Sequence, residues 1–268
     1  MSRLRHMAVP DGTSIAYRDQ SPPLSDPPRT ILLLHGLAGH LGEWDALTPG
    51  LLAAGFRVVS YDARGHGAST RRPHTVSRAA HVEDARTLIE ELELTRVTVV
   101  GQSMGGNTAM LLASAHPELV SSLILLEAGP GGPNPDVPTQ IAAWLDGWPT
   151  PFRSFGEAER FLGHEAWARG LEQRPDGWCP RFDPDTMVAT ITEVAARAYW
   201  EEWSRLSCPT LVVRGGKGML PAGAAEEMLR RRPQGTRLTV IPDAGHDVHL
   251  DCPGRLLAAM EEFRLDQA

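Results

Sequence analysis

The sequence predicts an α/β fold in which a mostly parallel sheet is covered by helices on both faces. Short runs of apolar and β-branched residues alternate with longer segments of helical spacing along most of the chain. These runs lack the polar alternation of a half-exposed strand, which indicates burial on both faces. With 268 residues, 42% of them hydrophobic, the chain is long enough for one large domain with an insertion.

The predicted elements follow one another in regular order, and they make an eight-stranded sheet. Residues 3–9 and 14–19 are expected to form a hairpin around the turn dipeptide Asp11-Gly12. Further strands are predicted at 29–34, 56–61, 97–100, 121–126, 209–213 and 236–241. Helices are predicted at 41–54, 77–92, 107–115, 222–231 and 254–265. In the helix at 77–92, the charged residues Glu83, Asp84 and Arg86 are expected on the outer face.

The stretch between the sixth and seventh strands has a different character. Glycine and proline dominate its beginning, short helical patches follow, and it holds six of the seven tryptophans. We expect residues 1–127 and 207–268 to form the core and residues 128–206 to form a helical cap after strand 6. An insertion at this point would cover the carboxyl ends of the strands, where open α/β sheets bind their ligands.

Charge and cysteine content limit the classes of function. The net charge of −7 disfavours a nucleic-acid partner or an anionic membrane surface. Three cysteines without CxxC spacing favour neither a disulfide framework nor a zinc site. Because the N-terminus lacks the apolar region of a signal peptide, we expect a soluble cytoplasmic protein. The sequence leaves the oligomeric state open.

The segment GQSMG at 101–105 fits the G-x-S-x-G pattern and follows a β-branched strand. In this pattern the glycines make room for a serine on a sharp strand-to-helix corner, with the helix N-terminus beside its hydroxyl. Ser103 is therefore the predicted nucleophile, and the N–H of Met104 is expected to stabilise an oxyanion. The alternative interpretation is a tight turn with an incidental serine.

A serine hydroxyl needs a base within hydrogen-bond reach, and the chain has ten histidines. His246 lies in a loop that leaves the last predicted strand, so it is the expected base. His35 and His66 flank turn glycines, which favours a role in bracing loops. His249 could form a metal pair with His246, but no third ligand cluster accompanies it, so we expect neither a metal nor a cofactor.

Four motifs together resemble those of the capped α/β hydrolases that use a serine nucleophile. They are HGLAG at 35–39, DARGHG at 62–67, GQSMGG at 101–106 and DAGHDVHLDCP at 243–253. The resemblance covers nearly the whole chain and implies the α/β-hydrolase fold. It also implies that the backbone N–H of Leu37 is the second oxyanion donor.

The third member of the triad departs from the family pattern. Most members place an aspartate a few residues after the turn at 214–216, where this chain has Lys217-Gly218-Met219-Leu220-Pro221 and no carboxylate. Glu127 ends the strand after the nucleophile's helix, a position that some members use for the acid, and it is the expected acid here. The alternatives are that Asp243, Asp247 or Asp251 orients His246, or that the site is a dyad.

The predicted activity is hydrolysis of a carboxylic ester, lactone or thioester of a largely apolar small molecule through an acyl-enzyme. Aromatic residues of the cap indicate an apolar pocket, to which His35, Trp144 and Trp148 are assigned. The tryptophans could instead form the cap's own core. Two alternatives keep the fold: other chemistry on the same serine (C–C bond hydrolysis, perhydrolysis of the haloperoxidase type, acyl transfer or cyclisation), or a non-catalytic binding protein.

Overall fold

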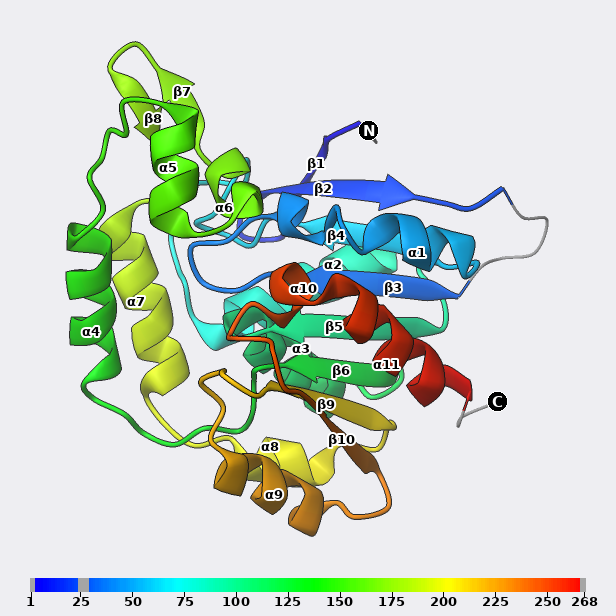
Figure 1. The fold of residues 1–268 in the computed structure, drawn as a ribbon. Helices are drawn as coiled ribbons and strands as arrows, with labels where there is room; N and C mark the ends of the chain where they lie inside the picture. The colour runs from blue at the N-terminus through cyan, green and yellow to red at the C-terminus, as the bar shows by residue number, and fades with distance from the viewer. Residues whose placement is uncertain (1–2, 24–28, 266–268) are drawn as a thin grey trace.

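Eight strands of the computed structural model, which describes residues 3–23 and 29–265, form one sheet. They are β1 (Arg5–Ala8), β2 (Ser14–Gln20), β3 (Thr30–Leu34), β4 (Arg57–Tyr61), β5 (Val97–Gln102), β6 (Val120–Leu126), β9 (Thr210–Gly215) and β10 (Thr236–Ile241). Their order across the sheet is β1-β2-β4-β3-β5-β6-β9-β10 (Figure 1). Strand β2 runs against both of its neighbours, and the other pairs are parallel. The predicted α/β fold is confirmed.

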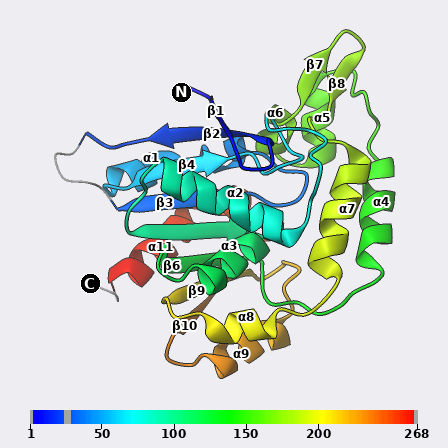
Figure 2. The ribbon, with the colours of Figure 1, turned by 180° about the vertical axis from the view of Figure 1, so that it is seen from behind.

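Helices cover both faces of this sheet. They are α1 (Thr48–Ala53), α2 (Arg78–Glu91), α3 (Met104–Ala115), α9 (Ala222–Arg231), α10 (Val248–Asp251) and α11 (Pro253–Leu265). Figure 1 shows α1, α10 and α11 on one face, and Figure 2 shows α2 and α3 on the other. Within the described part of the chain, no helix combines the length and the apolar character needed to cross a bilayer.

The strands bury residues on both faces because successive side chains of a strand point in opposite directions. In β3, Leu32 and Leu34 belong to the hydrophobic cluster that includes α2 and α3. Ile31 and Leu33 belong to the cluster beneath α1 and α11. All four side chains are at most 2% exposed, so the continuous apolar run in the sequence reflects a central strand that is buried on both faces.

The segment between β6 and β9 lies at the carboxyl ends of the parallel strands (Figure 1). It contains α4 (Val137–Asp146), α5 (Phe155–Leu162), α6 (Glu165–Arg169), β7 (Glu172–Arg174), β8 (Gly177–Cys179), α7 (Pro184–Ala195) and α8 (Trp200–Arg205). Leu145, Trp148, Phe152 and Met187 are among the residues of a separate hydrophobic cluster in this segment. Trp203 of α8 instead joins the cluster beneath α2 and α3.

Two elements differ from the sequence prediction. The expected single helix at 41–54 is a 3₁₀ helix, Leu41–Trp44, followed by α1. Pro49 lies in the first turn of α1, where its missing N–H is tolerated, and this favours a new helix start over a continuous helix. The segment predicted to be helical also contains the antiparallel hairpin of β7 and β8, whose turn at Pro175-Asp176 was not recognised in the sequence.

Asp84 was expected on the outer face of its helix, and this prediction is wrong. Its side chain is 1% exposed and accepts two hydrogen bonds, of 2.7 and 2.6 Å, from the Arg64 guanidinium. Arg64 is also 1% exposed and donates to Asp11 at 2.7 Å and to the Thr75 carbonyl at 3.0 Å. The buried pair therefore ties the loop after β4 to α2 and to the β1–β2 turn.

Removal of this buried carboxylate should destabilise the fold strongly, because the Arg64 charge would lose its bidentate partner inside the protein. We expect Asp84→Ala to lower the free energy of unfolding by about 3–5 kcal/mol in urea titrations. Glu90→Ala, which removes an exposed partner of Arg86 from the same helix, should change it by less than about 1 kcal/mol. Equal losses in the two variants would contradict the structural role of the Arg64–Asp84 pair.

Candidate active site

Ser103 lies at the corner between β5 and α3, with φ 50° and ψ −115°. Its N–H donates to the Leu126 carbonyl of β6 at 3.0 Å, and its side chain is half-buried. The corner depends on glycine: a Cβ at Gly101 would lie 2.4 Å from the Gly105 carbonyl oxygen, and one at Gly105 would lie 2.4 Å from that of Leu34. The missing side chains thus allow α3 to begin directly against the strands.

The turn that carries Leu37 is packed against this corner. A Cβ at Gly36 would come within 2.0 Å of Gln102 Oε1 and 3.5 Å of Ser103 Cβ. Neither the Leu37 N–H nor the Met104 N–H donates a hydrogen bond to any other described residue. Met104 is the first residue of α3, so its N–H has no partner within the helix. Two backbone donors are therefore available beside Ser103.

Glu127 follows β6 in a left-handed backbone conformation, with φ 50°. Its side chain is fully buried, and its two oxygens accept three backbone hydrogen bonds, from the N–H groups of Gly215 (2.7 Å), Met219 (2.5 Å) and Leu220 (2.9 Å). The Oε2 atom also lies 3.4 Å from Nδ1 of His246. The structure thus brings together the carboxylate and the imidazole that the sequence analysis singled out.

The surroundings of Glu127 favour its ionised form. Burial alone would raise the pKa of this carboxyl, but the hydrogen bonds from His246 and from the three backbone N–H groups outweigh burial and hold the pKa below its usual value. The loop at 217–221 therefore supplies N–H donors in place of a carboxylate of its own. Gly218 makes room for the acid, since a Cβ there would lie 2.2 Å from Glu127 Oε1.

The loop that carries His246 also contacts the residue before Ser103. Gln102 Nε2 donates to the His246 carbonyl at 3.1 Å and to Asp247 Oδ1 at 3.3 Å. The hydrogen bonds of the described residues do not include one between the Ser103 hydroxyl and the His246 ring. Such contacts are often long without a substrate and shorten in the complex. The Gln102 contacts hold the Ser103 corner and the His246 loop at the same edge of the sheet.

The three aspartates considered as alternative acids have other partners. Asp243 pairs with Arg255 at 2.8 Å on the surface. Asp247 Oδ2 accepts from the Trp167 indole at 3.1 Å, which links this loop to α6. Asp251 accepts from the Gly245 N–H at 2.6 Å and lies 3.1 Å from His164. Among the described carboxylates, only that of Glu127 lies within hydrogen-bond distance of the His246 ring.

His35 is 1% exposed, and both of its ring nitrogens are engaged within the protein. Nδ1 donates to the Gly36 carbonyl at 2.7 Å and Nε2 accepts from the Ala63 N–H at 3.0 Å, so the ring is neutral. Burial lowers its pKa to about 3. The His66 ring packs against it at 5.0 Å. His35 thus connects the 35–39 turn to the loop after β4.

His249 is fully buried, and its Nε2 lies 3.2 Å from Glu43 Oε2. Burial raises the pKa of Glu43 to about 8 and lowers that of His249 to about 4. Both groups are therefore largely neutral at pH 7, and the Glu43 carboxyl can donate to the imidazole. The pair connects the 3₁₀ helix to α10.

The two tryptophans assigned to the pocket have different surroundings. Trp144 on α4 is 41% exposed, whereas Trp148, just beyond the end of α4, is 6% exposed. Their rings meet edge to face at 5.3 Å. Trp148 also packs against Phe152 and Phe182, within the hydrophobic cluster of the inserted segment. Trp144 is thus the more accessible ring.

Gln102 and Gly218 were missed by the sequence analysis. Gln102 occupies an unspecified position of the G-x-S-x-G pattern, and its contact with the His246 loop spans 144 residues of chain. Gly218 could have been suspected, because the absence of a carboxylate from its loop requires the acid to enter from elsewhere. Neither interaction could be derived from local sequence.

This arrangement of a serine corner, a histidine loop and a buried acid on a mostly parallel sheet agrees with the family comparison. Residues 29–253 match the family model described as alpha/beta hydrolase fold. The chain therefore belongs to the α/β hydrolase family, and the resemblance stated from its motifs is confirmed.

Individual relatives are named for the hydrolysis of different bonds. RutD of Caulobacter sp. (strain K31), provisionally named a carbamate hydrolase, is 31% identical over 254 residues, which cover 90% of this chain and 92% of RutD. The mouse sn-1-specific diacylglycerol lipase ABHD11 is 27% identical over 252 residues, covering 87% of this chain and 80% of the lipase. The crystal structure of E-2-(acetamidomethylene)succinate hydrolase superposes with a TM-score of 0.87 at 20% identity, covering 98% of this chain and 99% of that one.

The buried Glu127 carboxylate should contribute to stability in a pH-dependent way. We expect Glu127→Gln to lower the free energy of unfolding at pH 7 by about 1–3 kcal/mol, because an amide N–H₂ would face a backbone N–H. The folded-state pKa of Glu127 lies below its usual 4.5, so its stabilisation is present above that pH. It is lost as the pH falls through the folded-state pKa.

Urea unfolding of both proteins at pH 7 and below pH 4.5 measures this effect, and the difference between them should narrow in acid. Glu201→Gln removes an exposed carboxylate from α8 and serves as the matched control, for which we expect almost no change. A difference for Glu127→Gln that stays constant or grows in acid would contradict the ionised state of Glu127.

Proposed function

We propose that this α/β hydrolase cleaves a carboxylic ester, lactone or thioester of a largely apolar substrate through an acyl-enzyme on Ser103. The observation that carries the proposal is the contact of His246 Nδ1 with the buried Glu127 carboxylate. Gln102, the residue before Ser103, donates to the His246 carbonyl and so holds the His246 loop beside the serine. A serine at a strained corner with a supported imidazole close by is the arrangement that nucleophilic acyl transfer requires.

In the proposed mechanism, His246 Nε2 accepts the Ser103 proton while the serine oxygen attacks the acyl carbon. The Leu37 and Met104 N–H groups donate to the oxyanion of the tetrahedral intermediate. Glu127 accepts the Nδ1–H of His246, which sets the tautomer and stabilises the imidazolium. The imidazolium then protonates the leaving alcohol or thiol, and a water molecule activated by His246 hydrolyses the acyl-enzyme.

We assign residues 128–206 as a cap over this site, on a core of residues 1–127 and 207–268. Its aromatic side chains favour a largely apolar substrate, and Trp144 is the more exposed of the two tryptophans assigned to the pocket. The hydrogen bond of Trp167 to Asp247 links this cap to the loop that carries His246. Substrate entry and the position of the base would thus be coupled through α6.

A carbamate is the second candidate substrate, because RutD covers 90% of this chain at 31% identity. The same serine, base and oxyanion donors would act on the carbamate carbonyl, and only the leaving group and the pocket would differ. Parallel assays with short-chain p-nitrophenyl esters and with p-nitrophenyl carbamates distinguish the two bonds.

Covalent labelling tests the nucleophile. We expect a fluorophosphonate to label the protein with a stoichiometry of about one, at Ser103, because a serine activated by a general base attacks phosphorus as well as acyl carbon. Intact-mass spectrometry measures the adduct, and Ser103→Ala is the control that should remain unlabelled. An unlabelled native protein would rule out the serine mechanism and favour a binding protein.

Kinetics on a p-nitrophenyl ester test the acid. Glu127→Gln should lower kcat by about 10⁴-fold, since the imidazolium loses its partner and the tautomer is no longer set. Circular dichroism at the assay temperature confirms that the variant is folded. Asp251→Asn, which changes a carboxylate without contact to the His246 ring, should retain most of the activity. Near-full turnover of Glu127→Gln, with loss of activity in Asp247→Asn or Asp251→Asn, would disprove the assignment.

A further inference from the structure

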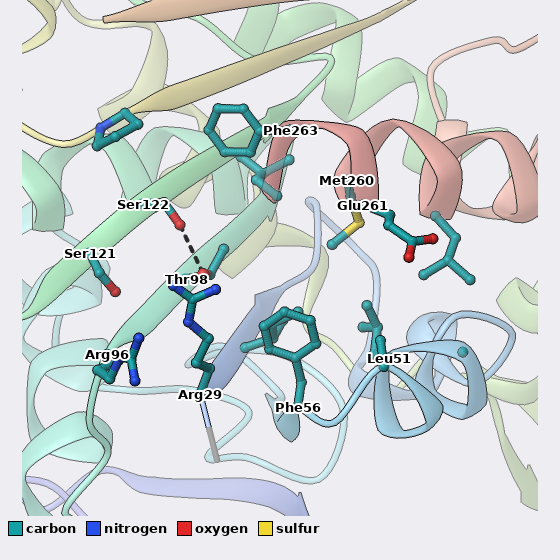
Figure 3. Close-up of a pocket in the computed structure, with 16 residues that line it drawn as sticks. Arg29, Leu51, Phe56, Arg96, Thr98, Ser121, Ser122, Met260, Glu261 and Phe263 are labelled. Atoms are coloured by element: carbon teal, nitrogen blue, oxygen red, sulfur yellow. Dashed lines mark hydrogen bonds between the residues drawn. The ribbon is translucent and has the colours of Figure 1, made fainter. Parts of the chain in front are cut away.

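A cavity of about 320 Å³ lies at the amino ends of the parallel strands, on the side of the sheet covered by α1 and α11 (Figure 3). Residues that line it come from the entrances of β3, β5 and β6, including Arg29, Thr98 and Ser122, and from both helices. Its volume is at the lower end of the range of about 300–1,000 Å³ that is typical of small-molecule sites. The cavity is therefore large enough to hold a small molecule.

One side of this cavity is basic. Arg29 and Arg96 extend their guanidinium groups toward the side where Ser121 and Thr98 lie (Figure 3). In residues 3–23 and 29–265, neither guanidinium has a hydrogen-bond or ion-pair partner. The Thr98 hydroxyl is paired with that of Ser122 at 2.8 Å. Two unpaired cations beside each other in a chain of net charge −7 are an attractive site for an anion.

The opposite side is mainly apolar. Leu51 of α1 and Met260 of α11 line it, and Phe56 lies between Leu51 and Arg29 (Figure 3). The Glu261 carboxyl lies at this far side, so its negative charge disfavours an anionic group there. The cavity is thus polarised, with cations at one side and an apolar wall ending in a carboxylate at the other.

The backbone at Arg96 is also unusual, because its φ is 52° in a residue that carries a full side chain. Five non-glycine residues among those described have positive φ, and three of them (Ala38, Ser103 and Glu127) belong to the candidate active site or the turn beside it. Positive φ in such residues persists where the surrounding structure imposes it, often at functional sites. Arg96 shares this property and lines the cavity.

We propose that this cavity binds a small amphiphilic monocarboxylate, with the carboxylate between Arg29 and Arg96 and the apolar chain along Leu51, Phe56 and Met260. Guanidinium groups suit a carboxylate because their planar N–H donors match its two oxygens. The apolar wall selects against small hydrophilic anions, since only a ligand with a chain or ring removes that surface from water.

This site is separate from the candidate active site. Thr98 lies near the start of β5 and Ser103 directly follows its last residue, and five residues of extended strand correspond to about 17 Å. The inference therefore does not depend on the proposed function, and its test needs no turnover.

Binding of decanoate to the full chain tests the proposal by isothermal titration calorimetry. We expect saturable binding that Arg29→Gln and Arg96→Gln each weaken at least tenfold, because each removes a charge-assisted hydrogen-bond donor. Arg3→Gln makes the same change of charge ahead of the edge strand β1 and should alter the affinity less than twofold. Decanol and acetate, which lack the head group and the chain respectively, should each bind at least tenfold more weakly.

Photo-crosslinking locates the ligand independently of activity. A decanoate analogue with a diazirine at the end of its chain should label peptides from α1 or α11, and unlabelled decanoate should compete. Labelling confined to peptides with Ser103, His246 or the inserted segment would place the acid at the hydrolase site and overturn the proposal. Absence of saturable binding, or equal affinity of the native protein and both arginine variants, would overturn it as well.

Discussion

The geometry of the candidate site depends on one buried carboxylate that reaches across the sheet. Glu127 leaves β6 in a left-handed conformation and accepts three N–H groups, all from β9 or the loop that follows it. A charge in this position is stable because these donors compensate for the water that burial removes from the carboxylate. The fourth partner, His246, comes from the loop after β10. A single side chain thus connects three neighbouring segments at the carboxyl edge of the sheet.

The two ends of the strands are used differently. At the carboxyl ends, glycines allow backbone segments to pack closely around the serine corner, and the Leu37 and Met104 N–H groups have no partner among the described residues. At the amino ends, α1 and α11 leave a cavity between apolar side chains and two arginines. The central strands of the sheet separate these regions, because each runs from one to the other and is buried on both faces. The His246 loop continues through α10 into α11, whose residues Met260 and Phe263 line the cavity, so the two regions are also connected by the chain itself.

Much of the fold could be predicted from local pattern. The periodic segments became the helices α2 and α9 within a residue of the expected ends, and the β-branched run before Ser103 became the buried strand β5. The errors arose where a long-range partner decides the outcome. Asp84 has the helical position of an outer residue, but the buried Arg64 draws it inward. The helix expected at 41–54 is divided because Pro49 favours a helix start.

The sequence by itself determined the strand–corner–helix around Ser103, because glycine spacing and β-branched residues act over a few neighbours. It also limited the candidates for the acid that orients His246 to a few carboxylates. Only the tertiary structure decided which carboxylate meets the His246 ring, since that contact joins residues 119 positions apart and depends on the space left at Gly218. The same holds for the cavity between α1 and α11, because its arginines and apolar wall come from segments that only folding brings together.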